Sequence, residues 1–394
     1  MAQTSKALRF IILLGFVSLF ADMTYEGSRS ITGPFFAFLG ASAAATGLVA
    51  GLGEFIGYAF RVVSGYFSDK SGKYWTITIW GYAVNLLAIP LLAFVDRWDV
   101  AAMLVVLERF GKAIRTPARD ALLSHATAEV GRGKGFGLHE AMDQIGALTG
   151  PLIVALMLWI RGGFKTGFEV LAIPALMALS VLVAARLLYP TPQDFEDPKK
   201  LDLKPHGRFP KVYWLYMIFV GLSIAGYAHF QVISYHFKHV NLISDIQIPI
   251  LFAVAMGVDG LTALIVGRLY DKHGWMTLLG IPLLSLPITP LVFLGGYWSA
   301  VAGVVLWGMA MGIQETIMRA AIADIIHAKK RGLAYGLFNA FYGLAWFAGS
   351  TLMGFLYTIS IPAIIAFSIG LELVSIPMLF RVRKAGAIQK ESWP

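Results

Sequence analysis

The stretches GYFSDKSGK at residues 65–73 and GRLYDKHGW at residues 267–275 are two copies of one polar loop, each set between long apolar runs. Their aligned residues lie 202 positions apart. A second pair keeps nearly the same offset, because RGKGFGL at residues 132–138 matches RGLAYGL at residues 331–337, 199 positions further on. Matches in one order at nearly one offset indicate that the chain arose by internal duplication.

The composition assigns the chain to the membrane proteins. Of its 394 residues 57% are hydrophobic and 14% charged, against about 25% charged in an ordinary soluble domain. The apolar residues form runs such as 75–95, 167–189 and 360–380, each close to the roughly 20 residues that cross the hydrocarbon core of a bilayer. A soluble fold could not bury that much apolar surface. Cysteine is absent, which excludes thiolate metal sites and disulfides.

The pattern predicts an all-α integral membrane fold of twelve transmembrane helices in two pseudo-symmetric bundles of six. The expected spans are 8–38, 45–67, 75–95, 99–121, 134–160, 167–189, 211–240, 246–270, 275–296, 298–324, 331–357 and 360–382. The stretch at 190–210 is rich in proline and charge, so we expect a cytoplasmic linker there. It separates an N-terminal bundle, 1–189, from a C-terminal bundle, 211–394.

The distribution of basic residues predicts the topology. Most of them fall at the two termini and in the connections from even to odd spans. By the positive-inside rule both termini are therefore cytoplasmic, in a multi-pass protein of the inner (plasma) membrane. The net charge of +9 is accounted for by this topology and by contact with the lipid bilayer. A nucleic-acid partner is not expected.

Over essentially its whole length the chain resembles the major facilitator superfamily. The resemblance rests on twelve spans, a central linker and the two polar loops, which look like the family's GxxxDxxGR-type loop. Within the family, the stretches at 108–123 and 131–151 are similar to a branch of bacterial and archaeal exporters. The resemblance implies alternating access, in which two halves rock about a central solute site.

The polar loops then form a conformational latch. In this interpretation the glycines allow tight turns and close helix approach, and the aspartates accept hydrogen bonds or pair with bases. Trp275 replaces the basic residue of the first copy, Lys73. The alternative to a latch is that each loop is simply a capped turn with no role in the transport cycle. The predicted latch residues are Gly65, Asp69, Gly72, Lys73, Asp120, Gly267, Asp271 and Gly274.

Ionisable residues inside the spans are candidates for function, because each costs several kcal/mol in lipid unless it is paired or hydrated. Asp22, Glu26 and Arg29 share one face of the first span at i, i+4 and i+7. Glu54 lies near the middle of the second span. The proton-coupling candidates are Glu54, Glu26 and Asp22, and the charges expected to line the cavity are Arg29, Arg61, Glu108, Arg109, Lys112, Asp143 and Asp259.

Two interpretations of these charges remain open. In one, a buried carboxylate exchanges a proton during each cycle and couples proton entry to solute exit. In the other, the acids and bases are permanently paired struts that set helix register. Aromatic side chains at five positions are expected to line the cavity: Tyr25, Tyr58, Tyr227, Tyr342 and Trp346.

Motifs for enzymatic chemistry are incomplete. The run HEAMD at residues 139–143 ends in aspartate, so it lacks the second histidine of a zinc-protease helix. His139 with Asp143 remains a candidate site for a divalent cation. The GK pair at 111–112 lacks the glycine spacing and hydroxyl residue of a phosphate-binding loop. We expect no cofactor and no enzymatic activity.

The function predicted from the sequence is secondary active transport by alternating access. The expected cycle is proton-coupled efflux of a small organic or amphipathic solute by a monomeric antiporter. A divalent metal-cation exporter is one alternative. A non-transporting membrane sensor or scaffold is another, although the charges within the spans and the lack of a sizeable soluble domain argue against it.

Overall fold

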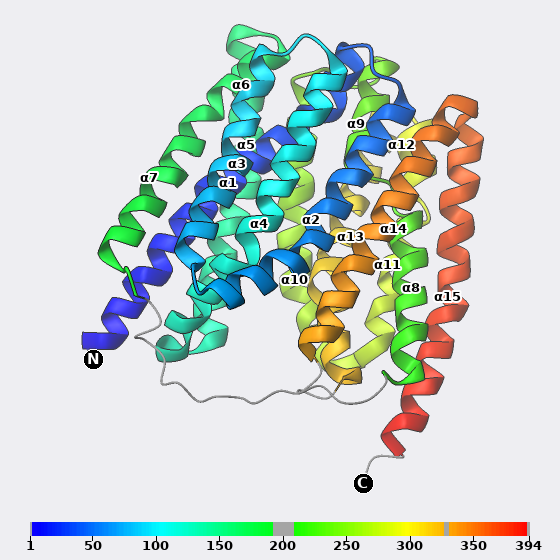
Figure 1. Cartoon of the computed structure of the whole chain (residues 1–394). Coiled ribbons are helices and arrows are strands. Elements are labelled where there is room, and N and C mark those ends of the chain that lie inside the picture. The colour runs from blue at the N-terminus through cyan, green and yellow to red at the C-terminus, as the bar shows by residue number, and fades with distance from the viewer. Residues whose placement is uncertain (1, 192–208, 327–330, 392–394) are drawn as a thin grey trace. The chain divides into compact units, whose positions relative to one another are not determined.

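The computed structural model describes residues 2–191, 209–326 and 331–391, and within these ranges every regular element is helical (Figure 1). This confirms the predicted all-α membrane fold. Most of the predicted linker, 190–210, lies outside the described residues. The helices are α1 (Ala2–Phe38), α2 (Ala43–Ser71), α3 (Tyr74–Leu91), α4 (Trp98–Val130), α5 (Arg132–Arg161), α6 (Phe164–Val170), α7 (Ala172–Leu188), α8 (Lys211–Gly226), α9 (Phe230–His239), α10 (Gln247–His273), α11 (Gly280–Ser285), α12 (Ile288–Leu294), α13 (Tyr297–Ile325), α14 (Arg331–Ile359) and α15 (Ile361–Glu391), with 3-10 turns at Leu92–Phe94 and Gly274–Leu279.

Nine helical stretches of the described chain are long and apolar enough to cross a membrane. One of them, Gln247–Leu294, has 48 residues, more than twice the roughly 20 needed for one crossing. Two further helices, α4 and α14, have 33 and 29 residues but fall outside the nine. The count of twelve spans therefore stays a prediction.

Three of the predicted spans are interrupted. The sixth, 167–189, is divided at Leu171 between α6 and α7. The seventh, expected to run through 211–240, stops at Gly226 and restarts at Phe230, so α8 and α9 flank a three-residue break. The ninth is divided among a 3-10 turn, α11 and α12. Hydropathy averaged over a span does not reveal such breaks, because Lys211–His239 as a whole is apolar enough to count as one membrane span.

The chain forms two compact units. The first comprises residues 1–40, 56–200 and 244–253, and the second comprises 41–55, 201–243 and 254–394. The first half of α2 therefore belongs to the same unit as α8 and α14. Two glycines explain its place there, since a Cβ on Gly51 would lie 2.8 Å from Phe347 Cα and one on Gly47 would collide with the carbonyl oxygen of Ser350.

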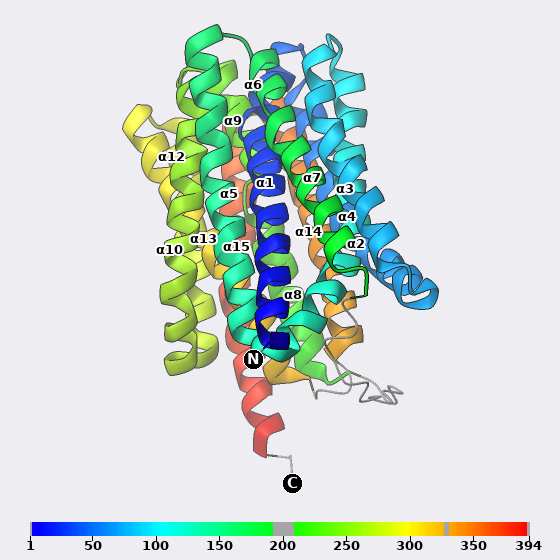
Figure 2. The same ribbon diagram turned by 90° about the vertical axis from the view of Figure 1, so that its left-hand side faces the viewer.

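In the first unit α1 lies between α5 and α7 (Figure 2). Its backbone meets α5 at two glycines, because a Cβ on Gly146 or Gly150 would collide with the carbonyl oxygens of Leu19 and Met23. Such close approach is the usual role of small residues in membrane helix packing. Backbone contact fixes the face of α1 that packs on α5, and with it the face that carries the charged residues.

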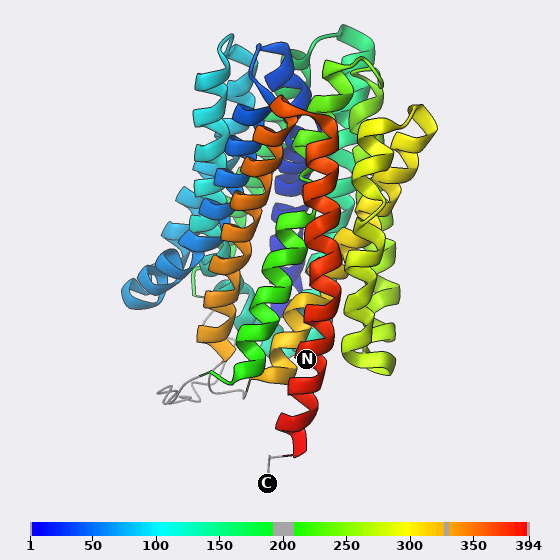
Figure 3. The same cartoon turned by 90° about the vertical axis from the view of Figure 1, so that its right-hand side faces the viewer.

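In the second unit α8 lies between α14 and α15 (Figure 3). Two tyrosines of α8 anchor it to neighbouring backbones. Tyr213 donates a hydrogen bond to the carbonyl oxygen of Ala334 at 2.8 Å, and Tyr216 donates to that of Met318 at 2.7 Å. Both side chains are fully buried. The half-span before the break is therefore held firmly against α13 and α14.

Candidate functional site

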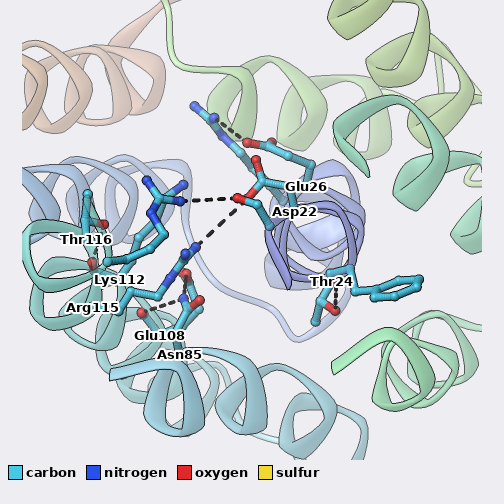
Figure 4. Close-up of polar contacts among 12 residues, drawn as sticks. Asp22, Thr24, Glu26, Asn85, Glu108, Lys112, Arg115 and Thr116 are labelled. Carbon is cyan, nitrogen blue, oxygen red and sulfur yellow. Dashed lines mark hydrogen bonds and ion pairs between the residues drawn. The ribbon is translucent and has the colours of Figure 1, made fainter. Parts of the chain in front are cut away.

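The acidic residues of α1 meet basic partners within the first unit. Arg29 lies 3.6 Å from Glu26 on the same helix, and both side chains are buried. One turn earlier, Asp22 lies 4.0 Å from the guanidinium of Arg115 of α4, and the two side chains point toward each other (Figure 4). The predicted shared face of α1 therefore faces bases, which is how charges are tolerated inside a span.

Two aromatic rings hold the cations of α4. The Nζ atom of Lys112 lies 3.5 Å from the centroid of the Tyr25 ring, and the Arg109 guanidinium lies 4.6 Å from it. The Arg115 guanidinium stacks over the ring of Tyr82 at 4.2 Å. Cation–π contacts gain strength where water is excluded, so these rings help to offset the desolvation of the basic residues.

Glu108 is held by a residue that the sequence interpretation missed. Asn85 of α3 donates a hydrogen bond from Nδ2 to Glu108 Oε1 at 2.6 Å, and Arg109 Nε lies 3.3 Å from Oε2. A Cβ on Gly111 would lie 2.8 Å from Asn85 Cα, so α3 and α4 touch at this point. The sequence does contain a sign of this contact, since Asn85 is a single amide within an apolar helix. Such a side chain needs a polar partner on another helix.

Glu54 belongs to the second unit, where its carboxylate Oε1 lies 3.5 Å from Nε2 of His229. His229 is fully buried and caps α9, since its Nδ1 accepts a hydrogen bond from the backbone N–H of Gln231 at 3.2 Å. An Nδ1 that accepts leaves the proton of a neutral imidazole on Nε2. The ring is therefore oriented to donate toward Glu54. His229 was not among the predicted site residues, since its role depends on the break before α9.

The predicted cavity aromatics divide between the two units. Tyr25 carries the α4 cations, and Tyr58 stacks on Arg61 of its own helix at 4.6 Å. Tyr227, at the break after α8, donates a hydrogen bond to the carbonyl oxygen of Trp307 at 2.7 Å. Trp346 contacts the rings of both Tyr227 and His229, and Tyr342 packs against Trp346. Aromatic rings thus surround the break in the seventh span.

Each of the two polar loops makes a tight turn at a glycine. Gly72 adopts a φ of 65° and Gly274 one of 58°, a left-handed conformation that favours glycine. A Cβ on Gly65 would lie 3.5 Å from Pro117, an ordinary contact, and one on Gly267 would meet nothing within 4 Å. Among the described residues, no close helix approach occurs at Gly65 or Gly267.

The aspartates of the latch have local partners. Asp69 accepts a hydrogen bond from Tyr74 Oη at 3.1 Å, and Asp120 accepts one from Arg119 Nη2 at 2.7 Å. In the second copy, the neighbour of Asp271, Tyr270, donates to Asp324 at 2.7 Å. The role of Lys73 and Asp120 in a latch stays a prediction.

The remaining predicted site residues are His139 and Asp143 of α5 and Asp259 of α10. His139 and Asp143 lie one turn apart on α5, and a buried atom of each, Nε2 and Oδ1, has no hydrogen-bond partner among the described residues. No group of three or more potential ligands that could hold a metal occurs among the described residues. Asp259 of α10 is buried, and a Cβ on Gly312 would lie 2.6 Å from its carbonyl oxygen.

A bundle of long apolar helices with paired charges buried inside its spans defines a polytopic membrane protein of the transporter class. The family model described as Major Facilitator Superfamily matches residues 12–314 and 217–393, and the chain belongs to this family. It is therefore a multi-pass membrane transporter, whose substrates are small-molecule solutes.

Relatives match over almost the whole chain. An uncharacterised protein of Mycobacterium tuberculosis (strain H37Rv) is 40% identical, over 96% of this chain and 94% of its own length. An uncharacterised MFS-type transporter of Methanocaldococcus jannaschii is 28% identical over 89% of each chain.

Solved structures share the fold at low identity. The nucleoside transporter NupG aligns with a TM-score of 0.73 at 13% identity, over 95% of this chain and 99% of its own. A peptide transporter of the POT type aligns with the same score at 12% identity, over 96% and 95%. At these identities the likeness extends to the fold alone.

Proposed function

We propose that the protein exports a small organic, amphipathic solute by alternating access and exchanges it for protons. It would act as a monomer in the inner (plasma) membrane with both termini in the cytoplasm, within an exporter-like branch of the family. The central observation is that two carboxylates inside helices lie beyond close hydrogen-bond distance from a basic or titratable group. The partly buried Asp22 of the first unit lies 4.0 Å from the Arg115 guanidinium, and the buried Glu54 of the second lies 3.5 Å from the His229 imidazole. Contacts at these separations are weaker than charge-assisted hydrogen bonds.

The separations matter for the cycle. A carboxylate locked in a short bidentate ion pair would hold its charge permanently and act as a strut. The contact of Asp22 with Arg115 and that of Glu54 Oε1 with His229 are instead ones that a small movement of a helix would shorten or break. Their affinity for a proton would then change with the state of the transporter, and such a difference is what couples two binding events.

Two bundles, 1–189 and 211–394, joined by the linker at 190–210, are the proposed moving bodies. The loops at Asp69 and Asp271 would latch the cytoplasmic side in one state. Asp69→Asn should slow transport with the apparent affinity for the solute nearly unchanged, because the loop does not contact the solute. A large loss of affinity with normal turnover would exclude the latch.

The experiment begins with a thermal-shift screen of the purified protein against candidate solutes and divalent cations, because binding to the folded state raises apparent stability. Positive solutes are then tested in proteoliposomes with an imposed pH gradient. Uphill movement of solute against the proton flow supports the proposal. Movement that depends on the solute gradient alone contradicts proton coupling.

The screen also separates the alternatives. A divalent cation as the strongest stabiliser, lost in His139→Ala, would favour the metal exporter. Solute binding without movement across the proteoliposome membrane would favour a sensor or scaffold.

A further inference from the structure

Glu372 of α15 is a buried acid that has no partner of opposite charge among the described residues. Its exposed fraction is 0%, and neither carboxylate oxygen has a hydrogen-bond partner of normal geometry. Among the described residues, no charged side chain or second titratable group acts on it, and the one polar group that faces it is the Ser285 hydroxyl. An isolated ionised carboxylate in an apolar interior is strongly unfavourable, so this acid is expected to bind a proton or a cation.

The acid packs directly against the break in the seventh span. A Cβ on Gly226, the last residue of α8, would lie 3.3 Å from Glu372 Cγ. One turn before Glu372, the Ser368 hydroxyl donates a hydrogen bond to the Gly226 carbonyl oxygen at 2.6 Å. The contact between α15 and α8, which lie side by side in Figure 3, therefore brings this acid to the point where the helix stops.

Unpartnered hydroxyls lie on the helices that pack around Glu372. Ser285 ends α11, Thr289 lies one turn later on α12, and Ser223 lies one turn before Gly226 on α8. All three side chains are buried, at 0 to 1% exposure, and none of their hydroxyls has a hydrogen-bond partner. These helices contact α15, and α11 also contacts α8. Oxygen-only donors with one carboxylate suit a hard cation of low charge.

We propose that Glu372 and Ser285 form a binding site for one monovalent cation, a proton or Na⁺, beside the break between α8 and α9. One positive charge neutralises the carboxylate, and the Ser285 oxygen supplies a second ligand or a hydrogen bond. Broken helices that pack against ion sites are a recurring design in membrane transporters. The site is separate from Glu54, which approaches the other end of the break through His229, and it does not rest on the proposed direction of transport.

The test uses the purified full-length protein. Its apparent melting temperature is measured while Na⁺ replaces choline at constant ionic strength. Infrared difference spectra between acidic and alkaline buffer record the C=O stretch of protonated carboxyl groups. If Na⁺ is the occupant, it raises the melting temperature by about 2 °C or more, and the rise is lost in Glu372→Gln. If a proton is the occupant, Na⁺ has no effect and a carboxyl band that titrates with pH disappears in Glu372→Gln.

Two controls keep the test decisive. Glu54→Gln removes the other carboxyl group near the break and should leave both signals intact, which separates this site from the proposed coupling residue. Ser285→Ala retains the acid and should weaken the Na⁺ response or shift the titration, so the result stands even if Glu372→Gln folds poorly. The proposal is wrong if neither Na⁺ nor pH gives a response that depends on Glu372, as expected for an acid that is neutral in every condition.

Discussion

Buried charge is handled differently in the two units. In the first, the acids of α1 and α4 face arginines of the same unit, and tyrosine rings cover the cations. In the second, Glu54 faces an imidazole whose other nitrogen caps a helix, and Glu372 faces a hydroxyl. In the first unit the counter-charges come from arginines of the chain itself. In the second, Glu372 faces a hydroxyl and no cation among the described residues, so we expect the stability of this unit to depend more strongly on pH and on added cations.

The largest effect should come from breaking an ion pair of the first unit. Arg115→Met removes a counter-charge of Asp22 and the cation over Tyr82, and breaking a buried pair typically costs about 3–5 kcal/mol of stability. We expect poor yield or a greatly lowered melting temperature, measured by thermal unfolding in detergent. Arg97→Met is the matched control, because Arg97 pairs with Asp99 in a largely exposed position, and it should unfold like the unmodified protein.

The double variant Arg115→Met with Asp22→Asn sharpens this result. It removes both charges, so most of the lost stability should return. A double variant that stays as unstable as the single one would show that packing of Arg115, and not charge pairing, dominates in the first unit.

A smaller loss of stability should follow from removing the Asn85 amide, which donates a hydrogen bond to Glu108. Asn85→Leu keeps the number and branching of the side-chain heavy atoms but deletes the 2.6 Å hydrogen bond to the carboxylate, and a buried group left unsatisfied costs about 1–3 kcal/mol. The measurement is again the unfolding midpoint. Thr78→Val, on the same helix, is the control, because the buried Thr78 hydroxyl has no hydrogen-bond partner. Equal effects of the two changes would argue against a specific role for Asn85.

In the second unit, Glu54→Gln should change transport more than stability. The amide resembles the protonated acid, so solute exchange between preloaded vesicles should persist while uphill transport driven by a pH gradient falls about tenfold or more, equivalent to about 1.4 kcal/mol of coupling. Normal uphill transport by a well-folded variant would move the coupling role to Glu26 or Asp22. An unfolded variant would instead favour the strut interpretation.

The smallest effect is expected at His229. His229→Asn retains a side chain that can cap α9 but alters the donor toward Glu54, so we expect a modest loss of stability, about 1 kcal/mol or less, and a shifted pH profile of transport. His236→Asn, on α9 itself, is the comparison. If both variants leave the pH profile unchanged, the contact between His229 and Glu54 is structural.

Much of the architecture could be read from the sequence for simple physical reasons. Apolar runs of span length cannot be hidden in a soluble fold, and helices are the form in which a bilayer-embedded segment satisfies its backbone. Helical periodicity alone placed Asp22, Glu26 and Arg29 on one face of α1. The tight turns at Gly72 and Gly274 followed from the repeated polar loop and appear as left-handed glycines.

The partners of those residues needed the tertiary structure. Asn85 and Glu108 are 23 positions apart, and nothing in the sequence selects one amide over another until α3 and α4 touch at Gly111. Glu54 and His229 are more distant still. Their contact depends on the first half of α2 joining the second unit and on a helix break that hydropathy does not register.

The sequence by itself determined the environment of this protein, its helical class, its internal duplication and the faces of single helices, because these depend on local composition and period. Only the tertiary structure decided which buried charge meets which partner, and that Glu372 meets no opposite charge in the part of the chain that the structure describes. Burial and pairing depend on the distances between helices that are far apart in the chain. Small residues at the contacts bring these helices together, and apolar sequences contain so many small residues that the sequence does not show which of them form contacts.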